Sequence, residues 1–319
     1  MQLADGHFHS GAHLAAELGI SRSAICKQIQ TLAELGVEVM PVSGKGYKLI
    51  QPMQLLDQVQ INAGLNPKTS RLLRRLDIHD SIESTNTLLL EQARAGEASG
   101  LVCVSESQHG GKGRRGRTWV SPFGHNIYLS MLWRYQEGPA ELGGLSLALG
   151  VAVVRALQQF GIQDAGLKWP NDIYWRQQKL AGILVEVSGE TGGPCYAVAG
   201  LGLNFFLSPQ QLLAIDQPCA HITAILGGAA YLRRNELLAM LLNELLPVMA
   251  GFEAAGLNNY LAEWRNYDCM SGREVTLFVG EQQYAGTVEG INQQGLLLLR
   301  TDDGQLRAFA SGEVSFKAR

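Results

Sequence analysis

The sequence predicts an α+β protein with three parts: an N-terminal helix-turn-helix with a β-hairpin, a central mixed-sheet α/β domain, and a small C-terminal β-barrel. Three observations predict this fold class. Apolar residues recur at helical spacing on both sides of Gly19. Helix-like and strand-like apolar runs are interspersed in the middle of the chain, and the C-terminal residues form short strand-like runs separated by turn residues. We expect domains at 1–52, 76–268 and 269–319, with a linker at 53–75.

Composition sets the class of protein. The chain has 319 residues, 46% of them hydrophobic, which is enough for two or three globular domains with real cores. The formal net charge is -3. Binding to nucleic acid therefore requires a local basic patch rather than an overall basic field.

Cysteine usage and apolar runs bear on the compartment. Five cysteines are scattered along the chain without a Cys-x-x-Cys pair, which argues against a disulfide framework or a zinc site and fits a reducing cytosol. The chain does not open with a basic-then-apolar leader. The longest apolar run, 145–157, is interrupted by Arg155 and is too short to cross a bilayer. We expect a cytoplasmic protein that does not enter membranes.

The N-terminal segment follows the pattern of a helix-turn-helix. Ser10 is the expected cap of a helix over 12–18, a glycine ends that helix, and Ser21 caps a second helix over 22–35. Alternating residues on both sides of 43–46 then predict a hairpin that resembles the wing of a winged helix.

The polar face of the second helix predicts contacts with DNA, because the second helix of such a pair enters the major groove. The residues expected to contact DNA are Ser21, Arg22, Ser23, Lys27 and Gln28 on this helix, and Lys45 on the wing. A small helical hairpin packed on the main body is the alternative. Winged helices normally have a full helix before this pair, and residues 1–6 are too short to supply one, which weakens the expectation of DNA binding.

A loop rich in glycine and arginine, GGKGRRGR at 110–117, is the central feature of the middle domain. Its cationic residues are Lys112, Arg114, Arg115 and Arg117. Glycine lets the backbone approach a ligand, and arginine donates to carboxylate and phosphate, so we expect the loop to close over an anion. The alternative is a solvated surface loop. Dinucleotide-binding and P-loop folds are excluded, because a strand-like segment follows the loop and the GK[ST] ending is missing.

Charged residues also interrupt apolar strands further along the chain. Lys168, Asp172 and Lys179 fall around one predicted hairpin turn at 176–178. A lysine on an apolar strand usually lies at an edge or extends to solvent. Two lysines and an aspartate near one hairpin favour a site, because buried charges must be paired.

Two further segments are interpreted from their spacing and composition. Ser84 or Thr85 is either the cap of a helix expected over 87–95 or a hydroxyl that faces a ligand, and the spacing favours the cap. After Asn204, the apolar segment 205–215 is broken by Ser-Pro, and we interpret it as a mobile lid.

Five motifs occur in one order along the chain: STN at 84–86, Gln108 before GGKGRRGRTW, KWPND at 168–172, KLAGILVE at 179–186, and GLGLN ending at 204. Together they resemble the bifunctional biotin–protein ligases that also repress the biotin operon, and the resemblance extends over nearly the whole chain. It implies an N-terminal winged helix, a central ligase domain of the biotin/lipoate ligase type, and a C-terminal SH3-like barrel.

The resemblance also implies a chemistry. Biotin and ATP, with Mg²⁺, give biotinyl-5′-AMP and pyrophosphate, and the adenylate then acylates a lysine of the biotin carboxyl carrier protein of acetyl-CoA carboxylase. The adenylate-loaded protein forms a homodimer that represses the biotin operon at its operator DNA. The first step brings two anions together, so preorganised cations are its main requirement.

The resemblance further implies roles for single residues. The expected catalytic residues are Lys179, Arg114 and Asp172. Biotin is expected to contact Ser84, Thr85, Asn86, Gln108, Lys112, Gly113, Arg114, Trp119 and Lys179. The nucleotide is expected to contact Arg115, Asn171 and Asn204. Asp172 serves either magnesium binding or the proton of the incoming amine, and no residues are expected to form a metal site by themselves.

Two alternative functions remain: a ligand-sensing repressor without ligase activity, and a lipoate or octanoyl transferase with the same central architecture. The basic loop, Asp172 and Lys179 argue against a pure sensor, and the winged helix, the KWPND motif and the loop favour biotin. The chain departs from the family at Lys112, where arginine is usual. Lysine keeps the charge but loses the bidentate fork, so we expect weaker retention of the ligand.

Overall fold

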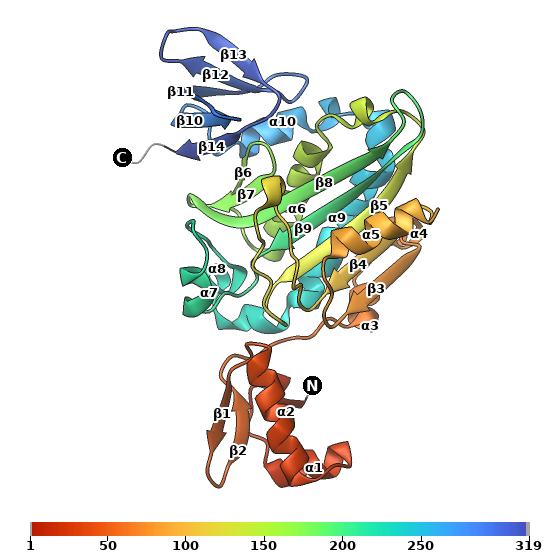
Figure 1. The fold of residues 1–319 in the computed structure, drawn as a ribbon, viewed down its shortest axis with the longest axis vertical. Coiled ribbons are helices and arrows are strands. Elements are labelled where there is room, and N and C mark those ends of the chain that lie inside the picture. The colour runs from red at the N-terminus through yellow and green to blue at the C-terminus, as the bar shows by residue number, and fades with distance from the viewer. Residues whose placement is uncertain (1, 317–319) are drawn as a thin grey trace.

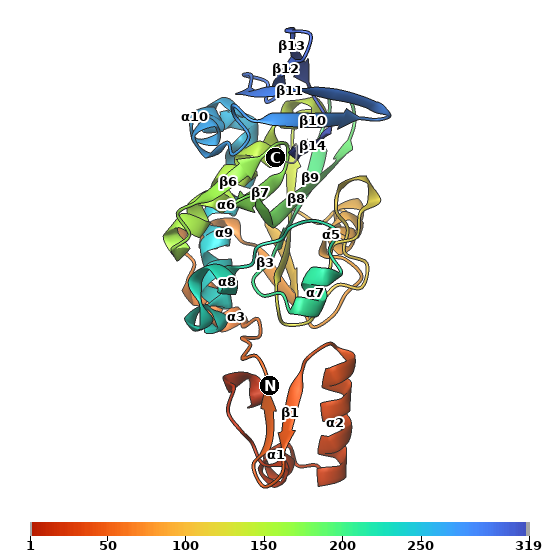
Figure 2. The ribbon, with the colours of Figure 1, turned by 90° about the vertical axis from the view of Figure 1, so that its left-hand side faces the viewer.

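The computed structural model describes residues 2–316 and has the three expected parts, as Figure 1 shows. The N-terminal, central and C-terminal domains follow one another along the longest axis of the molecule. Figure 2 shows an extended segment between the N-terminal domain and the central domain. The predicted fold class is confirmed.

The N-terminal domain is a helix-turn-helix followed by a hairpin. Its elements are η1 (Gln2–Asp5), α1 (Gly11–Leu18), α2 (Arg22–Glu34), β1 (Val39–Val42) and β2 (Gly46–Leu49). The hydroxyls of Ser10 and Ser21 cap α1 and α2 by accepting hydrogen bonds from backbone N–H groups at 3.1 and 3.2 Å, as predicted. In place of a full first helix, η1 forms a single turn, and its Leu3 is buried in a small core with Ile25 and Leu49.

The segment predicted as a linker is largely folded onto the central domain. It contains α3 (Gln58–Ala63) and α4 (Pro67–Leu72), and both helices pack against α9 (Arg234–Ala255). The amide oxygens of Asn235 and Asn243 on α9 accept hydrogen bonds from the backbone N–H groups of Asp57 (3.0 Å) and Asn66 (2.9 Å). These two asparagines therefore tie the start of each short helix to α9.

The central domain is built on a seven-stranded mixed sheet. In spatial order its strands are β3 (Arg75–His79), β4 (Leu101–Ser105), β5 (Ile127–Tyr135), β9 (Cys195–Leu203), β8 (Gln178–Gly189), β7 (Asp172–Trp175) and β6 (Ala165–Lys168). Only β3 and β4 are parallel neighbours, and the other neighbours in this sheet pair antiparallel. The sheet carries the ligand cavity described below.

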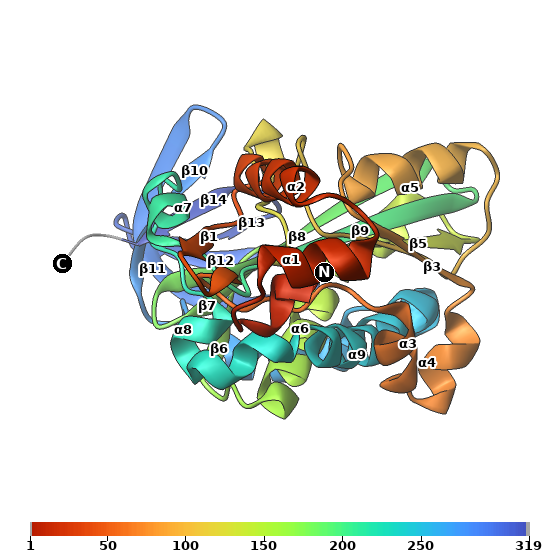
Figure 3. The ribbon, with the colours of Figure 1, turned by 90° about the horizontal axis from the view of Figure 1, so that it is seen from below.

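Helices cover the two faces of this sheet unequally. Seen from the N-terminal end in Figure 3, α5 (Thr85–Arg94) lies on one face, and α6 (Leu145–Phe160) and α9 lie on the other. The strongly apolar α6 is mostly buried and packs on α9 and α10 (Asn258–Tyr267). The large core therefore lies between α6, α9 and the sheet, and only a smaller cluster lies under α5. This leaves room on the α5 face.

Two helical stretches are long and apolar enough to cross a membrane by length and composition alone. They are 139–160 and 234–255, which include α6 and α9. Their most apolar windows are 67% and 56% buried inside the fold, which is the usual situation of core helices. Two such helices are therefore only weak evidence of a membrane span, because buried core helices meet the same criteria.

The C-terminal domain is a five-stranded antiparallel sheet with the strand order β13, β12, β11, β10, β14. Its strands are β10 (Glu274–Val279), β11 (Gln282–Ile291), β12 (Leu297–Thr301), β13 (Leu306–Phe309) and β14 (Glu313–Phe316). Short strands separated by turn residues were expected here, and the structure has them. The edge strand β14 leads back toward the central domain and reaches the ligand cavity.

The central domain also contains several short elements, and η2 (Arg114–Gly116) among them contributes to the cavity wall. The others are η3 (Pro139–Leu142), α7 (Pro209–Leu213), α8 (Ile222–Leu226) and η4 (Gly228–Leu232). The predicted lid is only partly a surface segment, because Phe205, Phe206 and Leu207 are buried. The amide oxygen of Asn126 accepts hydrogen bonds from the backbone N–H groups of Phe205 (2.8 Å) and Phe206 (3.2 Å), which anchors the start of the segment.

Candidate active site

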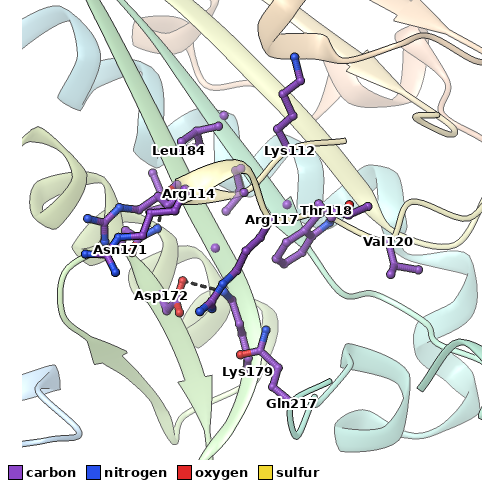
Figure 4. A pocket seen from close by; sticks show the side chains of 18 of the residues that line it. Lys112, Arg114, Arg117, Thr118, Val120, Asn171, Asp172, Lys179, Leu184 and Gln217 are labelled. Atoms are coloured by element: carbon purple, nitrogen blue, oxygen red, sulfur yellow. Dashed lines mark hydrogen bonds and ion pairs between the residues drawn. The ribbon is translucent and has the colours of Figure 1, made fainter. Parts of the chain in front are cut away.

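The ligand cavity lies on the α5 face of the central sheet and has a volume of about 530 Å³, within the range of small-molecule sites. The glycine-rich loop, the 168–182 hairpin, the 214–219 segment and the start of β14 surround it. The structure brings every predicted ligase-site residue to its wall: Ser84, Thr85, Asn86, Gln108, Lys112, Gly113, Arg114, Arg115, Trp119, Asn171, Asp172, Lys179 and Asn204. Figure 4 shows several of these side chains.

Glycines form the floor of the cavity where Trp119 crosses the sheet. Gly182 on β8 and Gly202 on β9 are directly paired neighbours. A Cβ at Gly202 would lie 2.6 Å from the indole nitrogen of Trp119, and a Cβ at Gly182 would lie 3.3 Å from the ring. The missing side chains therefore allow the indole to lie flat against the strands, as a wall for an apolar ligand.

One end of the cavity is polar and uncharged, and we call Thr85 and Gln108 there the polar recess. The amide oxygen of Gln108 accepts hydrogen bonds from the backbone N–H (2.8 Å) and the hydroxyl (3.1 Å) of Thr85. Behind Thr85, the buried hydroxyl of Ser130 lies 2.7 Å from the Thr85 hydroxyl and 2.5 Å from the amide oxygen of Asn86. The Asn86 amide nitrogen donates to a carboxylate oxygen of Glu186 at 2.8 Å. Fixed donors and acceptors of this kind suit a polar ring.

Ser84 has the structural role that its spacing predicts. It is the N-cap of α5, and its hydroxyl accepts a hydrogen bond from the backbone N–H of Thr87 at 3.4 Å. Because Ser84 also lines the cavity, the first turn of α5 begins beside the polar recess, with the N–H groups of Thr85 and Thr87 held by Gln108 and Ser84.

The other end of the cavity is cationic, and we call Arg114, Lys168 and Lys179 the cationic end. Lys179 Nζ forms an ion pair with a carboxylate oxygen of Asp172 at 2.9 Å, the dashed line in Figure 4. Arg114 donates to the amide oxygen of Asn171 at 3.1 Å. Burial lowers the pKa values of Arg114 and of Lys168, although the charge of Asp172 opposes this shift in both. Burying these cations is unfavourable, and an anionic group bound at this end would offset that cost.

Two asparagines hold the walls of this end in place. Asn171 donates from its amide nitrogen to the backbone oxygen of Ile183 at 2.7 Å, so its oxygen faces Arg114. Asn204 is buried and donates to the backbone oxygens of Lys179 (3.3 Å) and Ala220 (3.2 Å). The second asparagine therefore joins β8 to the segment that follows the predicted lid.

The glycine-rich loop is only partly engaged with the cavity. Arg115 adopts a positive φ of 57°, and Gly116 follows at 73°. This left-handed turn directs Arg115 and Arg117 toward Glu313 at the start of β14, with which both form ion pairs. Lys112 is exposed and points away from Lys179 in Figure 4. In this structure the loop cations therefore divide between the cavity and the C-terminal domain.

Several cavity residues escaped sequence reasoning. Glu313 is 196 residues from Arg117, and no local pattern connects them. Burial tends to raise the pKa of Glu313, but the hydrogen bond and charge of Arg117 with the charge of Arg115 outweigh it and lower the pKa. Gly182 and Gly202 lie side by side because of the register between β8 and β9, and the sequence of one strand does not reveal that register. Ser130 lies behind the cavity wall and does not line it, and its hydroxyl within the mostly apolar strand β5 was the available signal.

The predicted DNA-contacting residues lie together outside the cavity. Arg22, Ser23, Lys27 and Gln28 are exposed on α2, and Lys45 is exposed at the tip of the hairpin. Ser21 is exposed as well, but its hydroxyl is engaged as the cap of α2. In the residues that the structure describes, no cluster of three or more His, Cys, Asp or Glu side chains is arranged to hold a metal ion.

Fold and site together define a class: an enzyme that activates a small carboxylic acid, joined to a DNA-binding domain. Family models agree with each part. The "Biotin/lipoate A/B protein ligase family" model matches residues 78–204, the "Biotin protein ligase C terminal domain" model matches 270–317, and an "HTH domain" model matches 2–48.

Known proteins narrow the class further. Over 317 residues the chain is 43% identical to "Bifunctional ligase/repressor BirA" of Escherichia coli (strain K12), covering 99% of this chain and 95% of that protein. It is 34% identical to "Biotin--[acetyl-CoA-carboxylase] ligase" of Mycobacterium tuberculosis, with 76% and 88% covered. The solved "Biotin protein ligase from Aquifex aeolicus in complex with biotin and ATP" matches with a TM-score of 0.64 and 27% identity, over 77% of this chain and 100% of that chain. The chain belongs to the biotin–protein ligase family, in the group of bifunctional ligase/repressors.

Proposed function

We propose that this protein converts biotin and ATP to biotinyl-5′-AMP and pyrophosphate, and then transfers the biotinyl group to a lysine of the biotin carboxyl carrier protein. We further propose that it represses the biotin biosynthetic operon, with biotinyl-5′-AMP as corepressor. Similarity to a bifunctional ligase/repressor over 99% of the chain supports both activities. The match to a ligase solved with biotin and ATP supports the two substrates.

The observation that carries the ligase proposal is the polarity of the cavity. Its polar recess at Thr85 and Gln108 suits the ureido ring of biotin, and its cationic end suits the biotin carboxylate and the ATP phosphates. Trp119 lies between the two ends, where the apolar ring and chain of biotin belong. A substrate with an uncharged ring, an apolar chain and a terminal carboxylate fits this sequence of surfaces.

In the first step, a biotin carboxylate oxygen attacks the α-phosphorus of ATP. A new phosphorus–oxygen bond forms, the bond to the bridging oxygen of the β-phosphate breaks, and pyrophosphate leaves. We assign to Lys179 and Arg114 the binding of the biotin carboxylate and the α-phosphate, because both side chains are cations at the same end of the cavity. Arg115, Asn171 and Asn204 are assigned to the nucleotide side. Preorganised cations supply most of the stabilisation in such a reaction.

In the second step, the amine of the carrier lysine attacks the biotinyl carbonyl, AMP leaves with the electron pair of the mixed anhydride, and the amine loses a proton. Asp172 is the carboxylate beside Lys179, and two roles are open to it. Mg²⁺ commonly uses one or two carboxylates together with substrate phosphates, and Asp172 fits that pattern. It also fits as the proton acceptor. If Asp172 helps to hold Mg²⁺, Asp172→Asn impairs formation of the adenylate. If Asp172 is the proton acceptor, Asp172→Asn impairs mainly the transfer of the biotinyl group to the carrier lysine.

Repression is proposed to depend on dimerisation of the adenylate-loaded form through an edge of the central sheet. Ordering of the glycine-rich loop over the adenylate is the proposed switch between carrier and DNA. Sedimentation velocity with and without biotin and ATP tests this, and we expect a doubling of mass only with both. An unchanged mass contradicts the switch but leaves the ligase proposal standing.

The direct test of the ligase proposal is incubation with MgATP, radiolabelled biotin and a carrier domain. We expect covalent label on the carrier, and its loss when ATP is omitted. Bound but untransferred biotin would identify a sensor without ligase activity. Transfer of lipoate or octanoate in preference to biotin would identify the related transferase.

A further inference from the structure

We propose that Ser130 is a positioning residue that makes the polar recess selective for a ligand with a ring N–H group. Ser130 lies in the middle of β5, is fully buried, and does not itself line the cavity. It acts through Thr85, which does line the cavity. The inference rests on the proposed function, in which the recess holds the ureido ring of biotin.

The orientation of Asn86 starts the argument. Its amide nitrogen donates to Glu186 Oε2 at 2.8 Å and to the backbone oxygen of Leu184 at 3.4 Å. Both partners are acceptors, so the nitrogen must face β8 and the amide oxygen must face Ser130. A Cβ at Gly200 would lie 2.9 Å from Asn86 Cγ, so glycine at this position leaves the amide room against the sheet.

Ser130 transmits this orientation to Thr85. Its hydroxyl lies 2.5 Å from Asn86 Oδ1 and 2.7 Å from Thr85 Oγ1. A serine hydroxyl has one proton, and an amide oxygen only accepts, so the proton of Ser130 belongs to the bond with Asn86. Between the hydroxyls of Ser130 and Thr85, Ser130 is then the acceptor. In this series of hydrogen bonds, each donor therefore points toward Glu186.

The hydroxyl proton of Thr85 is therefore donated to an acceptor within the protein and not to the cavity. Its available acceptors are Ser130 Oγ at 2.7 Å and Gln108 Oε1 at 3.1 Å. Ser130 is the nearer of the two, and its own proton is donated to Asn86, so the Thr85 proton lies in the bond to Ser130 and Thr85 offers only lone pairs to the cavity. Gln108 Oε1 also accepts from the Thr85 backbone N–H, and Gln108 Nε2 donates one hydrogen to Ser121 Oγ at 3.4 Å. The second hydrogen of that nitrogen remains for a ligand.

The polar recess thus presents one acceptor and one donor side by side. A ring N–H beside a carbonyl, as in a cyclic urea, satisfies both. A ring oxygen in place of that N–H sets lone pairs against the lone pairs of Thr85, and a buried pair of acceptors without a proton is costly. Selectivity of the recess depends on Ser130, because without it Thr85 keeps only the more distant acceptor Gln108 Oε1, which already accepts from the Thr85 backbone N–H, and the Thr85 proton can then turn toward the ligand.

The test compares the wild type with Ser130→Ala in adenylate formation, measured as initial rates of pyrophosphate release. The substrates are biotin and the two cyclic carbamate analogues in which one ring N–H is replaced by oxygen. We expect the wild type to reject one carbamate strongly. In Ser130→Ala, the ratio of kcat/KM for biotin over that carbamate should fall about tenfold, with a higher KM for biotin and a kcat within about twofold.

A purely structural role for Ser130 predicts a different result, in which all three substrates lose activity together and the ratio stays constant. That result overturns the proposal. Glu186→Gln provides a second variant, since its amide can donate to Asn86 Oδ1 and allow the chain to reverse. For Glu186→Gln we expect the ratio of kcat/KM for biotin over the carbamate to fall as well, but by less than in Ser130→Ala.

Glu190→Gln is the matched control, because Glu190 is exposed just beyond the end of β8. We expect Glu190→Gln to have the same ratio of kcat/KM for biotin over the carbamate as the wild type. If Ser130→Ala does not fold, the ratio in Glu186→Gln decides, and an unchanged ratio there counts against the proposal. A wild type that forms no adenylate from biotin refutes the proposed function itself.

Discussion

Gly202→Ala tests the assigned role of Trp119 with the smallest possible change. The added Cβ would lie 2.6 Å from the indole nitrogen, whereas ordinary contact begins at 3.4 Å. The indole must therefore move by about 1 Å, because the strand beneath it is paired on both sides. A misplacement of about 1 Å in an active site costs up to about 100-fold. We expect kcat/KM for biotin to fall by about 10-fold to 100-fold, or about 1.4–2.7 kcal/mol.

The assay is pyrophosphate release at limiting biotin, together with a thermal unfolding curve. Trp119 is only partly buried on a loop, so we expect little change in the midpoint of unfolding. Gly251→Ala on α9 is the matched control, since a Cβ there meets nothing within 4 Å. An unchanged kcat/KM in Gly202→Ala would refute the placement of Trp119 against the ligand.

Three further predictions have defined outcomes. Lys112→Arg restores the bidentate fork, and we expect biotinyl-5′-AMP to dissociate more slowly in a filter-binding chase; an unchanged rate contradicts the role of Lys112. Burial, with help from the charge of Arg234, lowers the pKa of His125 to about 4, so the unfolded chain takes up a proton near pH 6.5 that the folded protein refuses. This contribution makes the free energy of unfolding fall by about 2 kcal/mol between pH 7 and pH 5, and urea unfolding of His125→Gln should show a smaller fall. Arg22→Ala and Lys45→Ala should each reduce, by about one, the slope of the logarithm of the operator-binding constant against the logarithm of salt concentration. Unchanged slopes would show that these two side chains do not contact DNA phosphates.

Local chemistry made much of this fold predictable. Ser10, Ser21 and Ser84 begin helices where a cap was expected, because capping depends on a few neighbouring residues. The strands of the C-terminal domain were also predicted, because their turn residues are local signals. The ligase-site residues were assigned from motifs, and the structure gathers them around one cavity.

Long-range pairing could not be predicted in the same way. The buried ion pair of Glu106 with Arg234 joins residues 128 positions apart, and Glu106 also accepts a hydrogen bond from the backbone N–H of Leu56 at 2.5 Å. Glu106, Arg234 and Leu56 belong to three separate segments, so no periodicity reveals these contacts. The same is true of Glu313 with Arg117. The prolines and glycine of 53–75 suggested a linker, but the asparagines of α9 hold that segment in place.

The central claim is that Arg114 and Lys179 bring two anions together. The most direct measurement is the single-turnover rate of biotinyl-5′-AMP formation in the Arg114→Gln, Lys179→Gln double variant, with the exposed pair Lys68→Gln, Arg71→Gln on α4 as the charge-matched control. Loss of one such donor typically costs about 10²–10³ in rate, so we predict a loss of at least about 10³-fold in the double variant and a normal rate in the control. A double variant that forms the adenylate at the wild-type rate would contradict the account.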